Sequence, residues 1–76
     1  MVVVTGGAQG IGRVVADALL AEGFKVSVWE HDREALEEER QRHSGHGGYM
    51  ALPCDVSSEE EVERALAETL AVLGRI

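Results

Sequence analysis

The chain has 76 residues, 45% of them hydrophobic, and its 14 acidic and seven basic side chains give a net charge of −7. A chain of this length forms one small unit or part of one, because it buries only about 60% of the surface that it exposes when unfolded. The acidic balance argues against nucleic acid or an anionic membrane as a partner, and no segment approaches the roughly 20 apolar residues that a membrane-spanning helix needs.

The first predicted element is a strand over residues 1–4, which are all apolar and mostly β-branched. Such a run is typical of a strand covered on both faces in a parallel sheet. A glycine-rich turn, Thr-Gly-Gly-Ala-Gln-Gly-Ile-Gly, follows at residues 5–12 and leads into a predicted helix over residues 11–20. A strand, a glycine turn and a helix in this order predict a phosphate site, since the first helical turn has unpaired N–H groups and partial positive charge. The glycines at Gly6, Gly10 and Gly12 let the backbone approach a diphosphate closely.

Apolar residues recur at helical spacing along this helix and predict one apolar face: Ile11, Val14, Val15, Ala18 and Leu19. Gly23 is placed to end the helix in a left-handed turn. Residues 24–29 predict the second strand, in which apolar Phe24, Val26 and Val28 alternate with Lys25 and Ser27. We expect Phe24 and Trp29 to belong to the core.

Glu30 follows this second strand, at the sheet edge where open α/β folds bind ligands. A carboxylate about 20 residues after the glycines can accept hydrogen bonds from the ribose hydroxyls of NAD. The 2′-phosphate of NADP would bring a second negative charge, and like charges about 4 Å apart cost on the order of 1 to 4 kcal/mol. The sequence therefore predicts NAD as cofactor, with NADP less favoured; a solvated glutamate at a strand end is the plainer alternative.

Asp32 is a plausible N-cap for a second helix over residues 33–42, whose polar side is Glu37, Glu38, Arg40 and Gln41. The acidic runs at residues 34–39 and 59–63 are interpreted as solvated helix faces. Residues 44–48, rich in glycine, end the helix. His43 and His46 are two imidazoles in a glycine loop that itself holds no cysteine or acidic ligand, so we expect no metal site.

Residues 49–53 predict a short third strand that ends at Pro53. Cys54, the only cysteine, excludes an intrachain disulfide, favours a cytoplasmic setting, and is expected to be a small buried hydrophobe. A capping box of Ser57 with Glu60, or Ser58 with Glu61, begins a third helix. Its apolar face is Val62, Ala65, Leu66, Thr69, Leu70 and Leu73, and Gly74 is its expected end.

The order βαβαβα predicts a Rossmann-type, doubly wound parallel sheet of three strands and three helices. Right-handed crossovers place the first two helices on one face and the third on the other. The first strand, suited to the centre of a sheet, would then be an unpaired apolar edge. We therefore expect residues 1–76 to be the N-terminal part of a single NAD-binding domain, truncated before a fourth strand.

Three motifs together resemble the short-chain dehydrogenase/reductase family. The spacing Thr-Gly-x-x-x-Gly-Ile-Gly at residues 5–12 is similar to the family's cofactor loop. The resemblance continues through residues 23–26 to Glu30, and through Cys54, Asp55 and Val56 after the third strand, so that it covers nearly the whole chain. It implies an NAD-dependent oxidoreductase that transfers hydride between an alcohol or carbonyl substrate and the nicotinamide. We expect the complete protein to be a homo-oligomer, since an unpaired apolar edge favours association.

The resemblance also implies roles for single residues. Asp55 would accept a hydrogen bond from the adenine amino group and Val56 would pack on the ring, although Asp55 could instead cap the third helix. Family members that use NADP often carry basic residues where this chain has Gln9 and His31, which supports NAD. The family's Tyr-x-x-x-Lys pair and Asn-Asn-Ala-Gly segment are absent, since the only tyrosine is Tyr49 and the only lysine is Lys25. This chain alone is expected to bind the adenosine end of a cofactor and to have no catalytic residue.

Two other functions are compatible with parts of the pattern. A non-catalytic NAD-binding or regulatory module would need the same glycine turn and the same Glu30. A phosphate-binding NTPase loop has the glycine separation of residues 7–12 but requires Lys and then Ser or Thr, where this chain has Arg13 and Val14.

Overall fold

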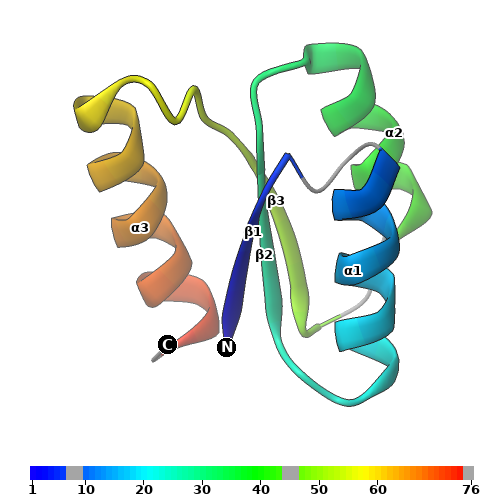
Figure 1. The fold of residues 1–76 in the computed structure, drawn as a ribbon. Coiled ribbons are helices and arrows are strands. Elements are labelled where there is room, and N and C mark those ends of the chain that lie inside the picture. Colours follow the sequence, from blue (N-terminus) through cyan, green and yellow to red (C-terminus); the bar gives the residue numbers. More distant parts are fainter. Residues whose placement is uncertain (7–9, 44–46, 75–76) are drawn as a thin grey trace.

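The structure is a computed structural model that describes residues 1–6, 10–43 and 47–74. Strands and helices alternate along the chain, in the order β1 (Val2–Thr5), α1 (Gly10–Ala21), β2 (Val26–Glu30), α2 (Arg33–Arg42), β3 (Tyr49–Pro53) and α3 (Glu59–Leu73). The strands form one parallel sheet with the order β1-β2-β3. Figure 1 shows α1 and α2 on one face of the sheet and α3 on the other. The predicted doubly wound arrangement is confirmed.

Each face of the sheet has its own apolar core, and β2 contributes to both. On the side of α1 and α2, Val26 and Val28 pack with the helical residues Ala16, Ala35 and Leu36. On the side of α3, the core is made by Trp29, Leu52, Cys54 and Ala65. All five residues of β2 are buried, because helices cover the strand from both sides. The burial of Trp29 and Cys54 agrees with the expectation from the sequence.

The predicted alternation of buried and exposed residues in β2 is wrong. Ser27, expected on a polar face, is fully buried, and Phe24, expected in the core, lies before the strand with 48% of its surface exposed. Ser27 is accommodated because its Oγ lies 2.9 Å from Thr69 Oγ1 of α3 and accepts a hydrogen bond from Trp29 Nε1 at 3.0 Å. Thr69 Oγ1 in turn donates to the Ala65 carbonyl. These bonds tie α3 to the central strand.

This buried network predicts a non-additive response to mutation. In Ser27→Ala or Thr69→Val, Trp29 Nε1 keeps one acceptor, so each change should lower the free energy of unfolding by about 1 kcal/mol. The double variant leaves the indole N–H without an acceptor, and a buried donor without a partner costs about 1–3 kcal/mol more. Urea unfolding followed by circular dichroism measures this coupling. Strictly additive losses would contradict the shared role of Trp29 Nε1.

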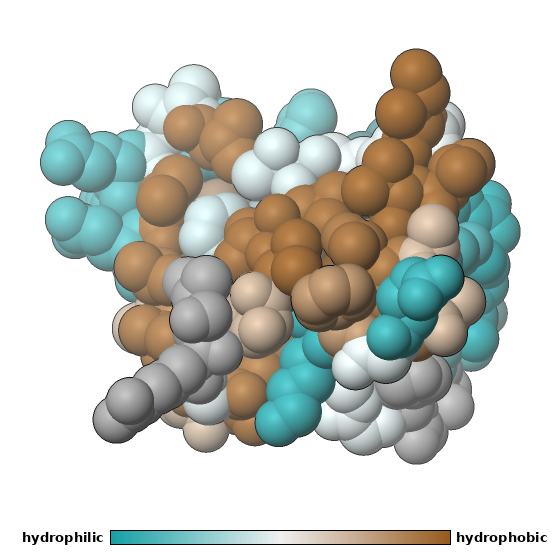
Figure 2. Space-filling view, turned by 60° about the horizontal axis from the view of Figure 1, so that its bottom comes forward, coloured by the Kyte–Doolittle hydropathy of each residue, from teal (hydrophilic) through white to brown (hydrophobic). Residues whose placement is uncertain are grey.

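The apolar face predicted for α1 is mostly wrong, because of its five residues only Leu19 packs on the core, and Ala18 is exposed. Ile11, Val14 and Val15 remain 83%, 68% and 44% exposed, whereas Ala16 is fully buried. The apolar arc of this helix is wider than the sheet surface beneath it, and β1, the strand under it, is an edge of the described sheet. Figure 2 shows apolar side chains across the middle of the view. On α3, Val72 is exposed as well, and so is Leu70, which was wrongly predicted to lie on the apolar face of that helix.

The helix ends follow their local sequence closely. Asp32 caps α2 through Oδ1, which accepts from the N–H groups of Glu34 and Ala35. Ser58 caps α3 by accepting from Glu61 N–H, but the Glu61 carboxylate bonds to Asp55 N–H, so the predicted reciprocal capping box is not formed. Gly23 and Gly74 have φ values of 91° and 86°, as helix-ending glycines do. Of the helices described here, none has the length and apolarity that crossing a bilayer requires.

Candidate nucleotide site

The candidate site lies where the three parallel strands end. Gly6 N–H donates to the Trp29 carbonyl at 2.8 Å, and Cys54 N–H donates to the Glu30 carbonyl at 3.1 Å. These two bonds place Gly6, Glu30 and Cys54 side by side at the carboxyl edge of the sheet. The glycine turn and the acidic residue therefore lie on the same rim, as the sequence predicts. This is also the rim at which open parallel sheets bind ligands.

Gly6 and Gly10 frame the turn between β1 and α1, and both need glycine for a conformational reason. Their φ values are 65° and 53°, in the left-handed region that other residues rarely adopt. Among the described residues, no atom lies within 4 Å of a Cβ built at either position. Gln9, a predicted site residue, lies outside the described residues. At Gly6 and Gly10, therefore, no described side chain hinders the approach of a ligand to the backbone.

The amino end of α1 lies beside this turn. The helix begins at Gly10, and both Gly10 and Ile11 are exposed, while Gly12 is half-buried in the first turn. The first N–H groups of a helix have no intrahelical acceptor, and the helix dipole adds partial positive charge there. An anion at this position would be stabilised by both effects.

Glu30 is held firmly at the tip of β2. Its side chain is only 4% exposed, and its Oε2 accepts hydrogen bonds from His31 N–H at 3.0 Å and Asp32 N–H at 3.4 Å. Both bonds use Oε2, and Oε1 is the remaining acceptor of the carboxylate. The sequence correctly places this acid at the rim but does not predict its burial, which results from its side chain folding back onto the turn that follows.

The predicted adenine residues lie on the neighbouring turn, between β3 and α3. Asp55 and Val56 are both exposed. Asp55 Oδ1 accepts hydrogen bonds from the N–H and the hydroxyl of Ser57, and these bonds lower the pKa of Asp55 below its usual value. Because Ser58 caps α3, the alternative in which Asp55 is the helix cap is wrong. Asp55 therefore offers an ionised acceptor at the rim.

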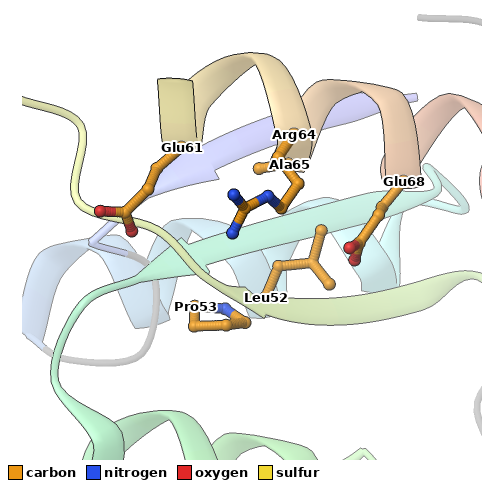
Figure 3. Close-up of a pocket in the computed structure, with 6 residues that line it drawn as sticks. All are labelled: Leu52, Pro53, Glu61, Arg64, Ala65 and Glu68. Carbon is orange, nitrogen blue, oxygen red and sulfur yellow. The ribbon is translucent and has the colours of Figure 1, made fainter. Parts of the chain in front are cut away.

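Two grooves flank β3, the strand farthest from the glycine turn. The larger, about 340 Å³, lies between β3 and α3 and is lined by Leu52, Pro53, Glu61, Arg64, Ala65 and Glu68. Figure 3 shows the Arg64 side chain above Leu52 and Pro53, with Glu61 and Glu68 on either side of it. The smaller, about 260 Å³, lies on the α2 side and shares Pro53. Neither groove is lined by Gly6, Gly10, Gly12 or Glu30.

A second cluster of charges joins α1 to α2 and was not predicted. Arg42 donates to both oxygens of Glu39 and to Asp17 Oδ2, each at 2.7 Å. His43 Nε2 lies 3.1 Å from Asp17 Oδ1 and 3.5 Å from Glu39 Oε1. Glu39 is 1% exposed, so the interpretation of residues 34–39 as a wholly solvated face is wrong. Ala35, Leu36 and Glu39 share one buried face of α2, and their helical spacing was the signal available in the sequence.

The electrostatics of this cluster favour an ion-pair network. Burial by itself raises the pKa of Asp17, but the hydrogen bonds and charges of Arg42 and His43 outweigh it and hold the pKa below its usual value. The carboxylate and imidazole atoms of Asp17, Glu39 and His43 lie within 4.8 Å of one another, a spacing compatible with a metal ion. Arg42, however, already bonds to both carboxylates that a cation would need.

Two reactive groups, the Tyr49 hydroxyl and the Cys54 thiol, are buried. Burial, followed by the negative charge of Glu39, raises the pKa of Tyr49, whose hydroxyl is enclosed at the start of β3 and has no hydrogen-bond partner among the described residues. Burial also raises the pKa of Cys54, as do the charges of Glu61 and Asp55. Neither group is therefore prepared to exchange protons or to attack a substrate at neutral pH.

Comparison with known proteins gives a consistent result. A family model described as short chain dehydrogenase matches residues 1–76. The chain is 41% identical over 71 residues to a rhamnolipids biosynthesis 3-oxoacyl-[acyl-carrier-protein] reductase of Pseudomonas aeruginosa, covering 93% of this chain and 27% of that protein. It is 38% identical over 73 residues to a 2,5-dichloro-2,5-cyclohexadiene-1,4-diol dehydrogenase of Sphingobium indicum, covering 96% and 28%. The chain spans about a quarter of the length of these relatives.

Solved structures agree with the fold. A short-chain dehydrogenase/reductase from Caenorhabditis elegans, whose structure contains a cofactor, superposes with a TM-score of 0.85 at 32% identity. The superposition covers 97% of this chain and 29% of the other. The similarity therefore extends over all three strands and helices described above.

Proposed function

The chain belongs to the short-chain dehydrogenase family, and from this premise we propose that it binds the adenosine diphosphate end of NAD within an oxidoreductase. The family binds nicotinamide cofactors, and the two named relatives are oxidoreductases, a reductase and a dehydrogenase. In this proposal, residues 1–76 form the N-terminal part of a single NAD-binding domain.

The observation that carries the proposal is the position of Glu30. Its carboxylate lies at the tip of β2, one strand away from Gly6 and on the same rim as the open amino end of α1. Oε1, to which none of the described residues donates a hydrogen bond, would accept from the ribose hydroxyls. A 2′-phosphate at that position would face a carboxylate with little solvent around it, where like charges repel more strongly than in water.

The remaining site residues fit the other parts of the cofactor. The open backbone at Gly6 and Gly10, with the N–H groups of Gly10, Ile11 and Gly12, suits the diphosphate. Gln9 would complete this turn. On the neighbouring turn, Asp55 would accept from the adenine amino group and Val56, which is 57% exposed, would pack on the ring.

Catalysis in the complete protein would depend on residues beyond this segment. Bound NAD supplies hydride transfer, and the protein supplies its binding and orientation. Tyr49, the only tyrosine, is enclosed at the amino end of β3, on the rim opposite to Glu30, which supports a segment without catalytic residues. The substrate would be a small alcohol or carbonyl compound, in keeping with the activities named for the relatives.

The uncovered apolar surface supports the view that these residues form part of a larger assembly. Val14 and Val15 of α1 and Leu70 and Val72 of α3 are exposed, and β1 is an edge of the described sheet. Contiguous apolar surface of this kind is usually covered by another part of the protein or by a partner. We place the remainder of the domain there, and an oligomer in the complete protein.

The direct test is calorimetric titration of the chain with NAD and with NADP at pH 7.5. NAD should bind with a dissociation constant at least about tenfold lower than that of NADP, which corresponds to about 1.4 kcal/mol. Equal affinities would contradict the role of Glu30. Failure of both dinucleotides to release or absorb heat, together with unchanged Trp29 fluorescence, would contradict the proposed function as a whole.

A further inference from the structure

β3 is the edge of the described sheet on the side opposite to β1. Cys54 N–H, just after the strand, donates to the Glu30 carbonyl of β2 at 3.1 Å. Because the N–H and C=O groups of neighbouring residues in a strand face opposite sides, the even-numbered residues bond to β2 and the odd-numbered ones face outward. The backbone groups of Tyr49, Ala51 and Pro53 therefore lie along the free edge of the sheet.

Two features limit pairing along this edge. Pro53 has no N–H to donate to another strand. The Ala51 carbonyl is already occupied, because the Arg40 guanidinium of α2 donates to it from Nε at 3.2 Å and from Nη2 at 3.0 Å. Hydrogen bonds from a charged donor are about twice as strong as those between neutral groups. An approaching strand would have to break both bonds and remove the guanidinium charge from water.

The space beside this edge would otherwise admit a strand. The two grooves described above lie on either side of β3, and an added strand would direct alternate side chains into them. Arginines line both grooves, but within the described part of the chain Arg40 is the one that bonds to β3, whereas Arg33 and Arg64 have no such bond. The strand itself, Tyr49–Pro53, has no charged side chain. Arg40 is thus the charge that is held against this strand.

We propose that Arg40 closes the β3 edge by holding a cation on the Ala51 carbonyl, and that a second copy of the chain pairs with this edge once the cation is removed. Two β3 strands related by a two-fold axis would run antiparallel, so that each copy contributes the same residues to a closed interface. Neither strand would bring a charge to the pair. Closure of the edge requires no bound nucleotide, and it is independent of the proposed NAD site.

The test replaces Arg40 with glutamine and measures self-association by sedimentation velocity in about 0.15 M NaCl, where repulsion between the acidic chains is screened. Arg40→Gln should lower the dissociation constant of self-association at least about tenfold, which corresponds to about 1.4 kcal/mol. The matched control is Arg33→Gln, which removes the same charge from the same helix and the same groove. Its dissociation constant should stay within about twofold of the wild type, because the β3 edge remains closed. Circular dichroism verifies that each variant is folded.

Amide hydrogen exchange locates the new contact. The N–H groups of Tyr49 and Ala51 face outward, so in Arg40→Gln their exchange should slow as the protein concentration rises. Exchange at Val3, on the β1 edge, should respond to concentration as it does in the wild type, which separates pairing at β3 from any association through β1. Arg40→Lys retains a cation that can donate to the Ala51 carbonyl, and its dissociation constant should lie within about threefold of the wild type.

Arg40 would lose this role if Arg40→Gln associated no more strongly than the wild type, or if Arg33→Gln associated as strongly as Arg40→Gln. Stronger association without slower exchange at Tyr49 and Ala51 would place the contact on another surface and contradict pairing at β3. Association of Arg40→Lys as strong as that of Arg40→Gln would show that a cation on the Ala51 carbonyl does not exclude a strand. None of these results would alter the NAD site.

Discussion

Replacing Glu30 with glutamine should narrow the preference for NAD over NADP by about tenfold or more. The amide can still accept from the N–H groups of His31 and Asp32, so the turn after β2 keeps its bonds, but the negative charge is lost. That charge repels a 2′-phosphate by on the order of 1 to 4 kcal/mol at about 4 Å. Most of the change should appear as tighter NADP binding, with a smaller loss of NAD affinity from the weaker acceptor.

The matched control is Glu38→Gln, which changes the net charge by the same amount on the exposed side of α2. It should leave the ratio of the two dissociation constants within about twofold of the wild type, since exposed charges far from the ligand are screened. Calorimetric titration gives the dissociation constants of NAD and NADP for the wild type, Glu30→Gln and Glu38→Gln. An unchanged ratio in Glu30→Gln, or an equal change in the control, would mean that Glu30 does not select the cofactor.

Replacing Arg42 with methionine should lower the free energy of unfolding by about 2–3 kcal/mol. The change removes two 2.7 Å bonds to Glu39, whose side chain is 1% exposed, and one to Asp17. Loss of one partner from a buried ion pair typically costs about 3–5 kcal/mol, and we expect less here because Arg42 is itself 31% exposed and Arg13 remains near Glu39. Urea unfolding followed by the fluorescence of Trp29 measures the change.

Two further variants test why Arg42→Met should destabilise the protein. Arg64→Met removes an arginine from an exposed position on α3, and should change stability by less than about 0.5 kcal/mol. In Glu39→Met combined with Arg42→Met, no buried carboxylate is left unpaired, so much of the loss should be recovered. A double variant less stable than Arg42→Met would contradict the view that an unpaired Glu39 causes the destabilisation.

The sequence predicted elements well where the determining interactions are local. The bounds of α2 and β3 agree with the structure, because Asp32 caps the helix from the adjacent residue and Pro53 ends a short apolar run. The position of the candidate site at one edge of the sheet was also predictable. Parallel strands joined by right-handed crossovers bring their carboxyl ends to one edge, so the order of the elements alone placed Gly6 near Glu30.

Contacts between distant segments account for what the sequence did not reveal. Ser27 was expected to be exposed, yet Thr69, 42 positions along the chain, provides the partner that allows its burial. Glu39 lies within an acidic run, and although its helical spacing from Ala35 and Leu36 hinted at burial, its pairing with Arg42 beside Asp17 depends on the approach of α1 to α2. The burial of Glu30 is different, because it depends on local bonds to His31 and Asp32 and on a side-chain conformation that no sequence pattern specifies.

The measurement that tests the central claim most directly is a map of backbone amide chemical shifts upon titration with ADP-ribose. If the carboxyl rim binds the nucleotide, the largest changes will occur at Gly6, Gly10, Ile11, His31 and Asp55. The amides of Gly23, Gly48 and Gly74, which follow α1, precede β3 and end α3, will change little. Changes concentrated at those three glycines, with an undisturbed glycine turn, would contradict the account.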